Sequence, residues 1–144
     1  MSLKIEAIQD KLYKLEQNTK FIEDILLDSD KKITADVGRY NGLEHLLQLS
    51  IQIILDTGAH ILAEEFGENP GSYQDVISTL GKRKIIDDKF AAEQTEMAKF
   101  RNKLIHDYGN IDHTKVLAYA REAPKVFRAF GKMFVDFIKN DKQL

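Results

Sequence analysis

The apolar positions of this chain recur with a helical period through most of its length. In the first stretch they follow one another at alternating spacings of three and four positions: Ile5, Ile8, Leu12, Leu15, Thr19, Ile22 and Leu26. That spacing places these residues on one face of an α-helix. Later long stretches show the same period, and no alternating strand pattern of useful length competes with them. The pattern therefore predicts an all-α fold.

Capping and turn-forming residues indicate where the helices begin and end. Ser29 and Asp87 can cap helix starts, residues 67–71 form a Gly- and Pro-containing loop, and Gly109 can stop a helix. Pro124 falls inside the last helical pattern and should kink or divide that helix. We predict a single domain over residues 1–144, an antiparallel bundle of four to five helices. The predicted helices lie near residues 3–27, 31–66, 73–80, 88–108 and 113–139.

Composition limits the classes of function that fit. A chain of 144 residues has the size of one domain, and its net charge of −2 gives no overall positive field for nucleic acid. Any RNA contact must therefore use a local basic patch. The chain has no Cys, which excludes disulfides and thiolate metal sites. No apolar run approaches the roughly 20 residues that cross a bilayer, and no signal-peptide pattern is evident. We expect a cytoplasmic protein without a membrane partner.

One stretch of eight residues, from Arg101 to Tyr108, combines several chemically useful groups. The planar guanidinium of Arg101 can hold a phosphate through two parallel hydrogen bonds. The imidazole of His106 can transfer a proton near neutral pH. Asn102 offers an amide, and Tyr108 offers a hydroxyl. These residues form the candidate site of the chain.

The helical wheel separates the two main groups of this stretch. Arg101 lies within roughly 60° of Met97 and Leu104, on the apolar side, whereas His106 lies about 140° away. A buried guanidinium without a partner is unfavourable, so Arg101 needs a carboxylate such as Glu44, a ligand or an interface. Either the helix opens near His106, or a second protomer related by a two-fold axis supplies the missing groups.

The spacing of Arg101, four residues, His106, one residue and Tyr108 resembles the R-x4-H-x-Y signature of HepT-like toxins in the HEPN superfamily. Arg39 and residues 69–73 also fall where that family has similar patterns. The resemblance implies a small all-helical RNase that needs no metal or other cofactor. It implies a homodimer, or a higher oligomer, in which two motif helices face one cleft. It also implies a type II/VII-like toxin–antitoxin pair, in which a minimal nucleotidyltransferase antitoxin transfers AMP to Tyr108.

RNA cleavage suits these side chains, because the 2′-hydroxyl of RNA can itself attack the neighbouring phosphate. His106 can act as the base or the acid, Arg101 can stabilise the phosphate, and Asn102 can bind the phosphate or orient His106. The expected function is therefore a metal-independent endoribonuclease. The alternative is a non-catalytic helical substrate-binding partner of a nucleotidyltransferase. A plain dimerisation module would leave Arg101 on the apolar side unexplained.

Other polar residues have two interpretations each. His60 and Glu64, four positions apart, can ligate a metal, but no third ligand is evident and a surface pair is the simpler interpretation. The run of residues 82–84, Lys-Arg-Lys, can contact RNA or the antitoxin, or it can be a solvated charge run. His45 and His113 stand alone in the sequence.

Overall fold

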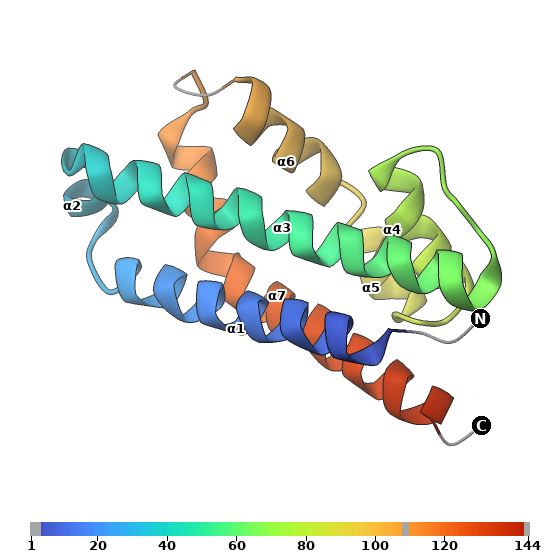
Figure 1. Cartoon of the computed structure of the whole chain (residues 1–144). Helices are drawn as coiled ribbons and strands as arrows, with labels where there is room; N and C mark the ends of the chain where they lie inside the picture. Colours follow the sequence, from blue (N-terminus) through green and yellow to red (C-terminus); the bar gives the residue numbers. More distant parts are fainter. Residues whose placement is uncertain (1–3, 108–109, 143–144) are drawn as a thin grey trace.

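The structure, a computed structural model, describes residues 4–107 and 110–142, and no strand occurs among them. Within these residues the helices are α1 Ile5–Ile25, α2 Asp30–Ala35, α3 Val37–Phe66, α4 Tyr73–Lys82, α5 Asp88–Glu93, α6 Met97–His106 and α7 His113–Lys142. In Figure 1, α1 runs along one side of α3, while α4 and α6 lie on its other side. The predicted all-α fold is confirmed, with more helices than the four to five expected.

Helix α3 is the central element of the bundle. It contacts α1, α4, α6 and α7, and most of its apolar side chains are fully buried: Leu43, Leu47, Ile51, Ile54, Leu55, Ile61 and Leu62. Its composition and its length of 30 residues would also suit a membrane span, but half of the most apolar window is buried inside the bundle. The core position of α3 accounts for its apolar composition.

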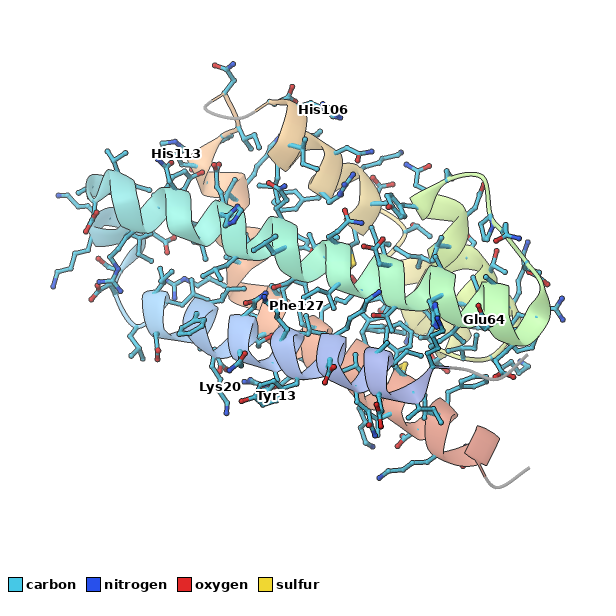
Figure 2. All side chains as sticks on the ribbon, in the orientation of Figure 1. Tyr13, Lys20, Glu64, His106, His113 and Phe127 are labelled. Atoms are coloured by element: carbon cyan, nitrogen blue, oxygen red, sulfur yellow. The ribbon has the colours of Figure 1, made fainter. Side chains whose placement is uncertain are left out.

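Helix α7 supplies the aromatic part of the core. Phe127, Phe130 and Phe134 are fully buried, and Figure 2 shows Phe127 near the long helices α1 and α3. Burying each ring stabilises the fold by about 1.5–3 kcal/mol relative to its exposure. Pro124, predicted to kink or divide the last helix, lies within the continuous helix α7, so the division is wrong and the kink stays a prediction. Core packing on both sides of Pro124 holds the two halves in one helix.

The predicted helix 31–66 is divided at Asp36. This residue has an extended backbone, and its Oδ1 accepts a hydrogen bond of 3.1 Å from the backbone N–H of Arg39. It thereby caps α3, while Ser29 caps the separate helix α2. Val37 lies directly after the break and is 69% exposed.

The predicted helix 88–108 is also divided, at residues 94–96. The Thr95 hydroxyl donates to the carbonyl of Ala92 at 3.2 Å, and the N–H of Met97 donates to the carbonyl of Gln94 at 3.1 Å. Such local hydrogen bonds of Thr compete with the helical pattern. The motif therefore lies on a ten-residue helix of its own, α6.

Two buried glycines allow helices to approach closely. A Cβ atom at Gly58 of α3 would lie 2.7 Å from Cδ1 of Leu80 in α4. A Cβ at Gly81 would lie 2.7 Å from the Cβ of Ala91 in α5. The helix α4 continues to Lys82, beyond the predicted end at residue 80. The small size of Gly81 lets α4 pack against α5.

Candidate functional site

Helix α6 presents an apolar side to the bundle and a basic side to solvent. Its buried residues are Met97, Ala98 and Leu104, and it packs against α3 and α4. The exposed side carries Lys99, Asn102, Lys103 and His106. Residues 97–106 contain no acidic side chain. α6 therefore forms a local basic patch on a chain whose net charge is −2.

Arg101 lies at the edge of this patch and is half-buried. Its guanidinium carbon is 5.2 Å from the ring centroid of Tyr73 in α4, which is within the range of a cation–π contact. Its Nη1 donates to Oδ1 of Asn102 at 2.9 Å. Its Nε is buried without a hydrogen-bond partner among the described residues. The guanidinium is thus held by an aromatic ring and a neutral amide, which leave its charge available to an anion.

A polar network lies behind the Tyr73 ring. The Tyr73 hydroxyl donates to Oδ1 of Asp56 at 3.2 Å, and Nε2 of Gln52 donates to the same oxygen at 2.7 Å. Gln52 Nε2 also lies 3.0 Å from the Tyr73 hydroxyl. The network holds the ring on which Arg101 rests.

The sequence alone does not indicate this network. Two signals were available: Gln52 and Asp56 are four residues apart on a helix, and Tyr73 belongs to the segment 69–73 that resembles the family. Neither signal shows that α3 and α4 meet beside α6. That contact depends on the packing of the three helices.

His106 is the last residue of α6 and is exposed. Figure 2 shows it at the outer end of the helix, away from the core. No hydrogen bond joins it to Arg101 or Asn102 among the described residues. Because α6 is regular from Met97 to His106, the helix does not open before His106, and the wheel separation persists. The prediction on Tyr108 lies outside the described residues, as does Gly109.

Glu44 is not the partner of Arg101. It is 4% exposed, and its Oε1 accepts a hydrogen bond of 3.0 Å from the hydroxyl of Tyr40. Burial, and then the hydrogen bond to Glu44, raise the pKa of Tyr40. His113 packs on this tyrosine with ring centroids 4.3 Å apart. The hypothesis of an ion pair between Arg101 and Glu44 is therefore wrong.

The other candidates of the sequence have separate positions. Within residues 82–84, Arg83 pairs with Glu68 and covers the ring of Phe66, and Lys84 lies 3.5 Å from Asp88. The Nε2 atom of His60 is buried without a described partner. In the parts of the chain that the structure describes, no three His, Cys, Asp or Glu residues gather as a possible metal site.

Comparisons with known proteins give sequence relatives with nuclease names. The Bacillus subtilis protein named "Putative RNase YutE" is 27% identical over 128 residues, which are 88% of this chain and 83% of that protein. The tRNA nuclease HepT of Aphanizomenon flos-aquae is 34% identical over 74 residues, 51% of this chain and 50% of that protein. This second similarity thus spans about half of each protein.

Solved structures show the same fold. The tri-AMPylated HEPN toxin of Shewanella oneidensis, solved in complex with the MNT antitoxin, has a TM-score of 0.81 at 19% identity. The match covers 90% of this chain and 96% of that one. YutE, described as a cytosolic protein of unknown function, has a TM-score of 0.80 at 22% identity over 96% of this chain and 93% of that one.

The family model described as "Ribonuclease HepT-like" matches residues 15–133, a range that includes α6 and the Arg101–Tyr108 stretch. The match covers most of the chain, and it agrees with the resemblance that the motif indicated. The protein therefore belongs to the HepT-like ribonuclease family.

Proposed function

We propose that this protein is a metal-independent endoribonuclease toxin whose site consists of Arg101, Asn102 and His106. The main support for the proposal is the environment of the Arg101 guanidinium. Its cation is supported by the Tyr73 ring and by Asn102, and no described carboxylate pairs with it. A phosphate diester would supply the missing anion and accept the free N–H donors.

The reaction needs only groups that this chain and RNA supply. A His106 imidazole takes the proton of the 2′-hydroxyl, and the 2′-oxygen attacks the adjacent phosphorus. The bond from phosphorus to the 5′-oxygen breaks, and that oxygen receives a proton from an imidazolium. Arg101 stabilises the charge on the non-bridging oxygens. The products are a 2′,3′-cyclic phosphate and a 5′-hydroxyl.

A homodimer would bring the separated groups together. Arg101 and His106 lie about 140° apart on one helix, so a single α6 does not direct both at one phosphate. A two-fold axis beside α6 would place His106 of one protomer near Arg101 of the other. It would also provide two imidazoles, one as the base and one as the acid. The exposed position of His106 allows this arrangement.

We propose further that a minimal nucleotidyltransferase is the antitoxin of this protein and transfers AMP to Tyr108. The Shewanella structure, a tri-AMPylated HEPN toxin with its MNT antitoxin, supports such a pairing. Tyr108 follows His106 by two residues. AMP at this position would add a phosphate that competes for Arg101 and a nucleoside that obstructs RNA.

Cleavage of total RNA in EDTA tests the catalytic proposal. Wild-type protein should cleave, His106→Ala should be slower by about 10²–10⁴-fold, and the control His45→Ala, at an exposed position of α3, should resemble the wild type. Cleavage that requires added Mg²⁺ would contradict the mechanism. Wild-type protein that binds a nucleotidyltransferase but cleaves no RNA would favour the alternative function, a non-catalytic partner.

A second experiment tests control through Tyr108. Tyr108→Phe should cleave RNA like the wild type but remain active after incubation with the nucleotidyltransferase and ATP. Mass spectrometry should detect AMP on the wild-type protein only. Loss of activity in the Phe variant, without a stable complex that explains it, would contradict a role for Tyr108.

A further inference from the structure

Asp56 on α3 is a half-buried carboxylate that the proposed reaction does not use. Among the described residues, no cation forms an ion pair with it. Its Oδ1 accepts hydrogen bonds from two neutral donors instead, Nε2 of Gln52 at 2.7 Å and the hydroxyl of Tyr73 at 3.2 Å. A partly buried charge without an opposite charge in contact is unfavourable, so the next charged group beyond these donors matters.

That group is Arg101, on the ring of the same tyrosine. Its guanidinium carbon lies 5.2 Å from the ring centroid of Tyr73, and no described carboxylate pairs with it. Tyr73 therefore contacts a negative charge through its hydroxyl and a positive charge through its ring. Nε2 of Gln52 also donates to the Tyr73 hydroxyl at 3.0 Å, which fixes the phenol in this position.

The hydrogen bond to Asp56 affects how strongly the ring attracts a cation. A phenol that donates to a carboxylate is polarised, and its ring gains electron density. The attraction between a cation and a ring is electrostatic, so it increases with that density. Asp56 thereby strengthens the contact between Tyr73 and Arg101 without occupying the N–H donors of the guanidinium. A direct ion pair would occupy the donors that a phosphate needs.

Arg83 provides a comparison within the same chain. Its guanidinium carbon lies 4.9 Å from the ring centroid of Phe66, which has no hydroxyl, and the guanidinium pairs directly with Glu68. At Arg101, in contrast, the aromatic ring separates the cation from the carboxylate. The two arginines have similar ring contacts, but only the contact of Arg101 is connected to a carboxylate through the ring.

We propose that Asp56 is a positioning residue for Arg101 and acts through Tyr73. Its charge holds the guanidinium on the ring and leaves the guanidinium donors free for a phosphate. Asp56 itself contacts no substrate in this proposal. The inference rests on the proposed function for the role of Arg101 in RNA cleavage, and it assigns a role to a carboxylate outside the motif.

NMR of the protein without RNA tests the positioning separately from cleavage. The Nε–H of Arg101, assigned by its loss in Arg101→Lys, should exchange slowly with water, because this atom is buried. Asp56→Asn removes the charge but keeps an acceptor oxygen, and it should accelerate this exchange about threefold, as expected for weakening of a cation–π contact. The Nε–H of Arg83 should not respond. The control Asp75→Asn, which removes an exposed carboxylate of α4, should change neither signal.

Cleavage kinetics measure the same effect in the proposed reaction. Asp56→Asn should lower kcat about threefold without raising KM for RNA, because removing a negative charge does not weaken the binding of an anion. In a Tyr73→Phe background, Asp56→Asn should have no further effect on kcat, since the hydroxyl that links Asp56 to the ring is absent. A purely structural role of Asp56 would lower the melting temperature and would not give this dependence on Tyr73.

The outcomes separate this inference from the proposed function. If the Arg101 signal responds as expected but wild-type protein cleaves no RNA, the positioning of Arg101 stands and the nuclease activity fails. If Asp56→Asn leaves the exchange of the Arg101 Nε–H unchanged, the inference is wrong. Active protein whose kcat is insensitive to Asp56→Asn, or equally sensitive with Tyr73 and with Phe at that position, would also overturn it.

Discussion

Arg128 on α7 and Arg101 on α6 occupy contrasting environments. Arg128 donates to Glu16 at 2.9 and 3.2 Å and to Glu23 at 2.7 Å twice, and so joins α7 to α1. Arg101 donates to one neutral amide and rests on Tyr73. Two carboxylates balance the positive charge of Arg128, whereas no described carboxylate pairs with Arg101.

This difference is the one expected if Arg128 stabilises the fold and Arg101 binds a phosphate. A phosphate that approached Arg128 would have to displace two carboxylates that already match its donors. At Arg101 the supporting groups hold the guanidinium in position but do not compete for its charge. The two arginines should therefore respond to mutation in opposite ways.

The largest effect is expected at Arg101. Arg101→Ala should reduce RNA cleavage by about 10²–10³-fold, comparable with the loss of a donor to a charged transition state. The melting temperature should stay within a few degrees of the wild type, because no described carboxylate loses a partner. Single-turnover cleavage and thermal unfolding measure the two quantities. A large decrease in melting temperature without a specific loss of cleavage would show that Arg101 has a structural role, like Arg128.

Arg128→Ala should show the reverse pattern. Loss of its two exposed carboxylate partners should destabilise the fold by about 1–2 kcal/mol, at about 0.2–1 kcal/mol per exposed ion pair plus lost packing of the side chain. Cleavage at low temperature should remain unchanged. Urea unfolding followed by circular dichroism gives the free energy of unfolding. A strong loss of activity in the folded variant would contradict a purely structural role.

A smaller effect is expected at Tyr73. Tyr73→Leu removes the ring beneath Arg101 and should slow cleavage by about fivefold, a cation–π contribution near 1 kcal/mol. Tyr73→Phe keeps the ring and should act more mildly, although it removes the hydrogen bond to Asp56. Equal losses in the two variants would show that the hydroxyl network, and not the ring, positions Arg101.

The smallest effect concerns pH. The hydrogen bond from Arg128 lowers the pKa of Glu23 below its usual value, so the ion pair adds stability at neutral pH. That contribution should be lost as the pH falls below the usual Glu value of about 4.3 and through the lowered pKa of Glu23. Glu23→Gln should show a weaker decline of melting temperature over this interval. Identical pH profiles would mean that solvent screens the pair completely.

The sequence predicted the fold better than the boundaries of its helices. Helical periodicity of core positions such as Ile22 and Phe134 was sufficient for the all-α architecture, because burial depends on period. The breaks at Asp36 and at residues 94–96 were missed, because the apolar stripe continues across them. Local side-chain hydrogen bonds decide such breaks, and their residue types also occur within helices.

The candidate site was predictable only where it is local in sequence. The motif indicated Arg101 and His106, and their roles remain predictions. The supports of Arg101 were not predicted, since Tyr73 and Asp56 come from other helices. The prediction that Glu44 pairs with Arg101 failed, because a helical wheel gives the direction of a side chain but not how deeply it is buried. The hydroxyl of Tyr40 on the same helix already donates to the Glu44 carboxylate.

The separation of α6 from α5 has a consequence for local unfolding. With ten residues, α6 is shorter than the roughly 12–15 residues at which an isolated helix becomes marginally stable in water, and only three of its side chains are buried. Its formation therefore depends on contacts with α3 and α4. Amide hydrogens of α6 should exchange with solvent by local opening, well before those of α3. The helix that bears Arg101 and His106 can thus open and close while the long helices of the bundle remain folded.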